Sequence, residues 1–153
     1  MKKTVILILA AFLFLSGCVG AAKTAPQAAL DAVNGIVSEY NDNLAEIYGD
    51  DSGGFNVESP DKDTINVTVT LPEMSEEMTS AMLGDEGSVR DWNYTLEDII
   101  LTCDELKSAV DETGNKAIAV SVSLMSEKDQ DLLMVEVQNG VLVYDAVSGI
   151  DLR

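Results

Sequence analysis

The sequence predicts a small α+β domain placed behind an export leader, and three observations lead to this prediction. Residues 26–48 repeat apolar side chains every three or four positions, which is the period of one helix face. Residues 65–71 and 117–125 alternate apolar and polar side chains, as half-buried strands do. Asn139-Gly140, between two further apolar runs, is the dipeptide most typical of a two-residue β-hairpin turn.

The first 17 residues have the organisation of a secretory signal peptide. Lys2 and Lys3 form a positively charged start, and residues 5–15 form an uninterrupted apolar run. That run is too short for a permanent helix across a hydrocarbon layer of ~30 Å, which needs about 20 residues. The alternatives are an ordinary cleaved signal with an incidental cysteine and a retained transmembrane anchor, although no basic stop-transfer cluster follows the run.

The apolar run ends in Leu15-Ser16-Gly17-Cys18, which resembles the lipobox of bacterial lipoprotein precursors. The resemblance implies that the Cys18 thiol receives a diacylglycerol, that the chain is cut before Cys18, and that acyl chains such as palmitate enter the cell membrane. Residues 18–25 are then a lipidated N-terminus and a tether of about 25 Å at full extension. We expect an extracytoplasmic location, at the cell surface or in the periplasm.

Charge and missing residue types exclude several classes of function. The 153 residues include 27 acidic and nine basic side chains; the leader removes two of the nine, which leaves seven and a net charge of −20. A surface of this charge repels nucleic acid, so we expect no nucleic-acid partner. The sequence contains no histidine, which excludes Ser-His-Asp and Cys-His catalysis and removes the usual zinc ligand.

The first predicted helix spans about residues 26–48 and is expected to bury one face. Pro26 suits a first helical turn, and Gly49 suits a left-handed stop. The apolar face of this helix comprises Leu30, Val33, Val37, Tyr40, Leu44 and Ile47.

The next segment is expected to contain two strands and a short helix. Residues 55–58 form a short strand, and after a turn residues 65–71 form a longer one. Pro72 ends that strand and opens a helix at about residues 73–83, which the glycine-containing segment 84–88 is expected to break.

A further helix is expected to begin at Thr95, where Thr95 and Asp98 have the spacing of a capping box, and to end at Gly114. Cys103 lies in the middle of its apolar stripe and is interpreted as a buried, inert thiol, since acylation of Cys18 leaves it without an intrachain partner. Trp92 and Tyr94 are expected to pack the start of this helix against the sheet, with a pocket-lining role as the alternative.

The last third is expected to be sheet. Residues 117–125 form one strand, and residues 132–138 form the first arm of a hairpin that turns at Asn139-Gly140. A two-residue turn predicts that one face of the hairpin holds the pairs Val137–Leu142, Val135–Tyr144 and Leu133–Ala146.

Acidic side chains are the only candidates for chemistry, and they form no recognisable catalytic or metal-binding motif. The loops contain the pairs Asp50-Asp51, Asp61/Asp63, Asp85-Glu86 and Asp129/Asp131. None has the spacing of a calcium-binding EF-hand loop. We therefore expect no catalytic residue, no metal site and no cofactor, with calcium binding at one of these loops as the alternative to plain solvation.

Strands with one apolar face covered by helices predict a two-layer α+β domain over residues 26–153. We expect an antiparallel, curved sheet of about four to five strands, packed against the long N-terminal helix and two further helices. Residues 63–74, followed by helices and a closing hairpin, resemble small Gram-positive lipoproteins with NTF2-like or cystatin-like folds, and residues 143–149 are similar to the end of PepSY domains. The NTF2-like resemblance implies a ligand pocket within a curved sheet and, in many members, no catalysis.

The expected function is that of a membrane-anchored, non-catalytic module that binds an unknown protein or small molecule. Two alternatives remain at this point, a hydrolase that works with carboxylates alone and a protease-inhibitor-like module. The hydrolase requires two carboxylates directed into a pocket within the sheet. The inhibitor requires an exposed edge strand or loop that can enter a protease cleft.

Overall fold

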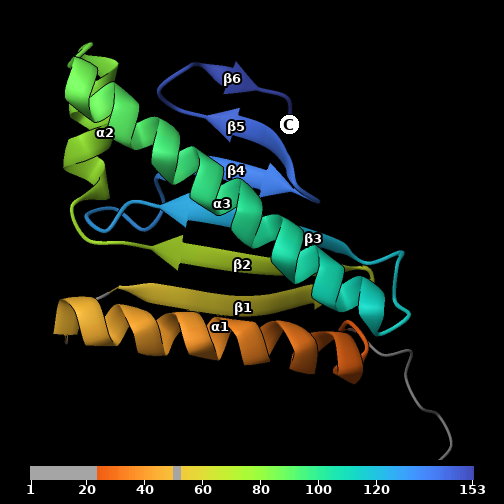
Figure 1. The fold of residues 1–153 in the computed structure, drawn as a ribbon. Helices are drawn as coiled ribbons and strands as arrows, with labels where there is room; N and C mark the ends of the chain where they lie inside the picture. The colour runs from red at the N-terminus through yellow and green to blue at the C-terminus, as the bar shows by residue number, and fades with distance from the viewer. Residues whose placement is uncertain (1–23, 50–52) are drawn as a thin grey trace, which may run out of the picture.

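The computed structural model describes residues 24–49 and 53–153, and within them it confirms the α+β class (Figure 1). The predicted leader, Cys18 and most of the tether lie outside the described residues. None of the described helices is both long and apolar enough to cross a membrane. The elements, in chain order, are α1 (Gln27–Tyr48), β1 (Gly54–Asp61), β2 (Thr64–Thr70), α2 (Met74–Met82), α3 (Glu86–Glu112), β3 (Ala119–Met125), β4 (Leu133–Gln138), β5 (Val141–Asp145) and β6 (Ile150–Asp151).

The sheet has six strands in the order β1-β2-β3-β4-β5-β6, one or two more than expected. The prediction of a purely antiparallel sheet was wrong at one pair, because β2 and β3 run parallel. The reason is the connection between them: α2 and α3 together form the crossover that returns the chain to the end of the sheet where β2 began. The other neighbouring strands pair antiparallel.

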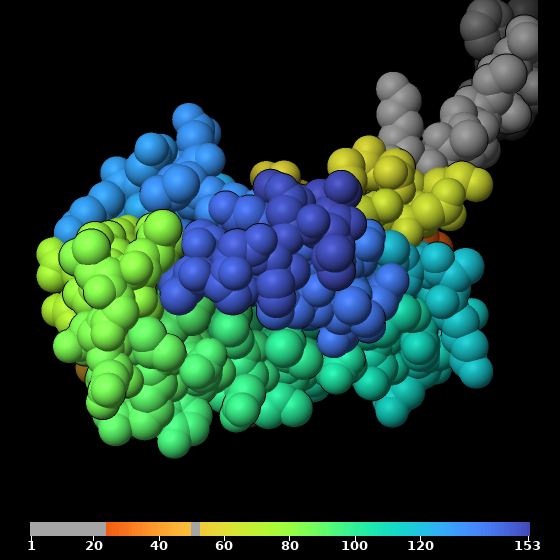
Figure 2. All heavy atoms as spheres, turned by 90° about the horizontal axis from the view of Figure 1, so that it is seen from above, coloured from red at the N-terminus to blue at the C-terminus, as the bar shows by residue number. Residues whose placement is uncertain are grey.

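The helices lie on one side of the sheet, and the core lies between the two layers. α3 crosses β3 and β4, while α1 runs beside β1 and contacts α3 (Figure 1). The alternation predicted for the central strands is confirmed, because their inward side chains are buried: Ile65, Val67, Val69, Ile118, Val120, Val122 and Leu124. Viewed along the sheet from β6, the opposite side carries none of the described helices, and the β3–β4 loop and the β1–β2 turn project there (Figure 2).

The helix predicted to start at Thr95 begins nine residues earlier, at Glu86. The predicted break at residues 84–88 is confined to Gly84 and Asp85. Gly84 has a φ of +84° and ends the preceding helical turn, and the Asp85 carboxylate then accepts hydrogen bonds from the Ser88 amide and hydroxyl at 2.9 Å. This N-cap offsets the low helix propensity of Gly87 and lets the helix start at once.

The predicted hairpin turn at Asn139-Gly140 and the pair Val137–Leu142 are confirmed, but the register beyond them was wrong. Val135 pairs with Asp145 rather than Tyr144, because Val143 is an extra residue in a β-bulge. Leu133 pairs with Met125 of β3, and the Ala146 amide donates to the Met134 carbonyl oxygen at 3.0 Å. The bulge turns Asp145 inward and Tyr144 outward.

The inward Asp145 explains how the hairpin tolerates this bulge. Its side chain is 1% exposed, and its Oδ1 accepts a hydrogen bond of 3.0 Å from Nε1 of the buried Trp92. The amide groups of Val147 and Ser148 donate to the same carboxylate. A buried indole N–H needs a hydrogen-bond acceptor, and a buried carboxylate needs hydrogen-bond donors. The bulge brings the Trp92 indole and the Asp145 carboxylate into contact, so each group has a partner. Trp92 therefore packs the start of α3 against the sheet as expected, whereas Tyr94 is 59% exposed.

Candidate functional site

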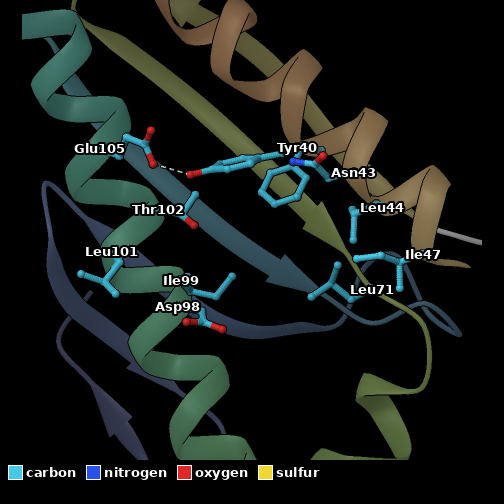
Figure 3. A pocket seen from close by; sticks show the side chains of 11 residues that line it. Tyr40, Asn43, Leu44, Ile47, Leu71, Asp98, Ile99, Leu101, Thr102 and Glu105 are labelled. Atoms are coloured by element: carbon cyan, nitrogen blue, oxygen red, sulfur yellow. Dashed lines mark hydrogen bonds between the residues drawn. The ribbon is translucent and has the colours of Figure 1, made fainter.

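An open groove of about 390 Å³ lies between the second half of α1 and the middle of α3 (Figure 3). The two helices diverge toward this end of the molecule (Figure 1). Phe55 of β1 and Leu71, just after β2, close the groove on the side of the sheet. The lining comprises Tyr40, Asn43, Leu44, Ile47, Phe55, Leu71, Asp98, Ile99, Leu101, Thr102 and Glu105.

The α1 wall continues the apolar stripe that the sequence predicted, but it is not covered. Val33 and Val37, in the first half of α1, are buried in the core. Leu44 and Ile47, about two and three turns beyond Val37, line the groove instead, and Ile47 is 71% exposed. The expectation that the whole stripe is buried was therefore wrong in the last two turns of the helix, beyond Tyr40, because α3 diverges from α1 there.

The α3 wall combines apolar and acidic side chains. Leu101 is 64% exposed, and Ile99 reaches the floor from the buried side of the helix. Asp98 and Glu105 are the two carboxylates of the lining. They are seven residues apart, which places them about 10.5 Å apart along a helix with a rise of 1.5 Å per residue.

Tyr40 joins the two walls. Its hydroxyl donates a hydrogen bond of 2.5 Å to Oε2 of Glu105, and its ring packs on Phe55 with centroids 5.2 Å apart (Figure 3). Burial raises the pKa of Tyr40, and the hydrogen bond to Glu105 and the charge of that carboxylate raise it further, to about 12, although Thr102 partly opposes them. The hydroxyl thus stays protonated at neutral pH and fixes the position of Glu105.

The groove can accommodate an apolar group next to a positive charge. The described lining contains two carboxylates and no lysine or arginine. Its other polar groups are the side chains of Tyr40, Asn43 and Thr102, and the Tyr40 hydroxyl is already bonded to the Glu105 carboxylate.

The residues singled out in the sequence lie elsewhere. Cys18 is outside the described residues. Cys103 is fully buried as predicted, with its Sγ 3.6 Å and 3.7 Å from the carbonyl oxygens of Val120 and Val137. Burial raises the pKa of this thiol, which the Gly140 amide opposes only in part. Cys103 therefore packs α3 against the β3–β4 pair.

The acidic pairs in the loops serve local structure. Asp61 accepts a hydrogen bond from the Asp63 amide, and Asp129 accepts one from the Asp131 amide, as in Asx turns. Asp85 caps α3. Asp50-Asp51 lies outside the described residues. In the part of the chain that the structure describes, no group of three or more His, Cys, Asp or Glu side chains is placed to hold a metal ion.

A second hollow, of about 560 Å³, lies where the chain enters the domain. It is lined by Thr24 and Pro26 at the start of α1, by the β1–β2 turn with Lys62, and by the segment before β3 with Lys116. Lys107 lies beside it, because its Nζ donates to the Lys116 carbonyl oxygen at 3.1 Å. This hollow and the α1–α3 groove are at opposite ends of α1.

Comparison with protein-family models, with the curated proteins and with the solved structures found no match. The proposals below therefore rest on the residues and geometry of this chain. The sequence placed Leu44 and Ile47 on the apolar face of the first helix, but no local signal indicated that this end of the face would lack a cover.

Proposed function

We propose that this protein is a membrane-anchored extracytoplasmic lipoprotein whose domain is a non-catalytic binding module, with the α1–α3 groove as its binding surface. The observation that carries the proposal is the grouping of exposed apolar side chains from two helices around one concavity. Ile47 and Leu101 are each more than half exposed there, which costs solvation free energy unless a partner covers them. The lipobox resemblance at Cys18 supplies the anchor.

The arrangement of carboxylates supports binding over hydrolysis. The inward positions of the central strands are apolar and filled, and Asp145, which is buried beside them, already accepts three hydrogen bonds. Asp98 and Glu105 are about 10.5 Å apart along one helix, beyond the roughly 5–9.5 Å that separates the two carboxyl groups of glycosidases. A carboxylate-based hydrolase therefore has no support in the described residues.

The protease-inhibitor alternative is also less well supported. One edge of the sheet, β1, is covered by α1, whose Asn41 side chain bonds both the amide and the carbonyl of Phe55. The other edge, β6, has two residues. Neither edge of the described sheet offers a long free strand for a protease cleft.

The anchor is tested by replacing the acylated cysteine. Cys18→Ala should abolish acylation, seen as loss of the lipid mass in a mass spectrum, and should release the protein from the membrane fraction. Cys103→Ala is the matched control and should remain acylated and membrane-bound. An unchanged membrane fraction for Cys18→Ala would contradict the anchor.

The groove is tested with Nile red, an uncharged apolar dye, and the unacylated chain 19–153. The dye should fluoresce on binding, and Ile47→Gln should weaken binding about tenfold, because burying an isoleucine side chain is worth about 1.5 kcal/mol or more. Leu83→Gln is the matched control, since Leu83 is 84% exposed and lies outside the groove. Equal binding by both variants would refute the groove as the binding surface.

A further inference from the structure

The apolar part of the groove has a shape that can accommodate a helix. Leu44 and Ile47 lie one turn apart on α1, and Ile99 faces them from α3, whereas Leu101 lies at the outer rim of the α3 wall (Figure 3). A groove between two diverging helices with apolar walls is the usual receptor for the apolar face of an amphipathic helix. Side chains at positions i+3 and i+4 of such a helix point the same way and can enter the concavity together.

The charged part of the groove has a matching spacing. Asp98 and Glu105 are two helical turns apart on the same wall, and Tyr40 holds Glu105 in place through Oε2, which leaves Oε1 open to a second donor. Neither carboxylate forms an ion pair among the described residues, although five other acidic side chains of this part of the chain do. Asp98 and Glu105 have no cation paired with them among the described residues, and they border an apolar floor. Electrostatic complementarity therefore favours a partner that carries two cations.

We propose that the groove holds a cationic amphipathic helix of a partner protein, with lysine or arginine at positions i and i+7 and apolar side chains at i+3 and i+4. The inference rests on the proposed function and names the chemistry of its partner. The i to i+7 rise of about 10.5 Å equals that between Asp98 and Glu105, so a helix lying along α3 sets one cation against each carboxylate. The apolar pair between them faces Leu44, Ile47 and Ile99.

The experiment compares two labelled peptides on the full acylated chain in phosphatidylcholine nanodiscs, a neutral surface, by fluorescence anisotropy. Both peptides are amphipathic helices with leucine at i+3 and i+4; one has lysine at i and i+7, and the other has glutamate there. We expect the lysine peptide to bind at least about tenfold more tightly, since each exposed ion pair contributes about two- to fivefold and the glutamate peptide is also repelled. Empty nanodiscs give the background.

The decisive variant is Asp98→Asn combined with Glu105→Gln, which keeps the shape of both side chains. It should weaken the lysine peptide about tenfold and leave the glutamate peptide unchanged or slightly tighter. Glu97→Gln combined with Glu112→Gln is the matched control, because it removes the same charge from exposed positions of α3 outside the groove. Unchanged circular dichroism and Trp92 fluorescence establish that each variant is folded.

The outcomes separate the two proposals. Equal weakening by both double variants would show that the overall charge attracts the peptide and would overturn the assignment of a cationic helix to this groove. Equal affinity for the two peptides, with loss of both in Ile47→Gln, would overturn the charge selectivity and leave the groove as a site for neutral apolar partners. Full binding of both peptides to Ile47→Gln would overturn the groove itself.

Discussion

Gly140 meets two demands at once. It has a φ of +77° in the turn between β4 and β5, and a Cβ at this position would lie 1.8 Å from Oδ1 of Asp104 on α3. Its amide also lies 3.4 Å from the Sγ of Cys103. The hairpin turn thus touches α3, and the absence of a side chain permits this contact.

Gly140→Ala should therefore destabilise the domain by more than the conformational cost alone, which is about 1–2 kcal/mol for a left-handed residue. Gly114→Ala is the matched control, because Gly114 has a φ of +86° and a Cβ added there would meet none of the described atoms within 4 Å. Urea unfolding measures both. Equal losses would show that the Asp104 side chain moves aside without cost.

Tyr40 should be distinguishable from the other three tyrosines in an alkaline titration. With its pKa raised to about 12, it should ionise after the rest when absorbance is followed at the phenolate band. Because the folded-state pKa lies above the ordinary 10.0, the stabilisation is complete below pH 10 and is lost as the pH rises toward 12.

Two variants assign the late titration. Tyr40→Phe should remove it. Glu105→Gln should move it to lower pH by removing the negative charge, while burial, the largest cause, keeps the pKa above 10.0. A single transition near pH 10 for all four tyrosines would contradict the contact between α1 and α3.

At the scale of elements, Asn41 attaches α1 to the free edge of β1. Its Nδ2 donates to the Phe55 carbonyl oxygen at 3.0 Å, and its Oδ1 accepts from the Phe55 amide at 2.7 Å. The side-chain amide thus takes the place of a neighbouring strand. An unpaired edge is a template for association, and α1 protects it here.

Asn41→Leu should cost about 1–3 kcal/mol, because it leaves one donor and one acceptor of Phe55 partly buried and unpaired. Asn34→Leu, at an exposed position of the same helix outside the groove, should change stability little. Hydrogen exchange at the Phe55 amide is the direct measurement and should accelerate only in the first variant. Equal exchange rates would show that water replaces the side chain.

Where local pattern determines an element, the sequence was enough to predict it. The alternation of β2 and β3 and the Asn139-Gly140 turn predicted which side chains are buried. Two features depended on distant partners and were missed. The start of α3 depends on the Asp85 cap, and the bulge in β5 depends on pairing Asp145 with Trp92, 53 residues away in sequence.

The groove depends on a still larger scale. The stripe of α1 predicted one apolar face but not where that face would lack a cover, since this follows from the angle between α1 and α3. The Tyr40–Glu105 contact spans 65 residues and has no local signature. The parallel pairing of β2 with β3 likewise follows from the two-helix crossover and not from either strand.

At the scale of the whole molecule, net charge is the dominant property. A chain with 27 acidic and nine basic residues repels itself, and salt screens this repulsion. Raising sodium chloride from about 10 to 200 mM should therefore raise the melting temperature by a few degrees, or about 1 kcal/mol. Differential scanning calorimetry of the unacylated chain measures the effect.

Calcium chloride at matched ionic strength is the comparison. General screening predicts nearly the same shift as with sodium chloride. A much larger shift with calcium would indicate a specific cation site, in contradiction to the roles of the acidic pairs in turns and caps.

The hollow at the start of α1 has a consequence for orientation. Lys62, Lys107 and Lys116 gather there, and Asp63 and Asp111 pair with the first two, so this hollow contains both signs of charge, whereas the groove near the other end of α1 contains carboxylates alone. An anionic surface therefore repels the groove more strongly than the start of α1. For a chain held by the proposed anchor at Cys18, this difference favours an orientation in which the groove points outward, up to about 30 Å beyond the start of a helix of 22 residues.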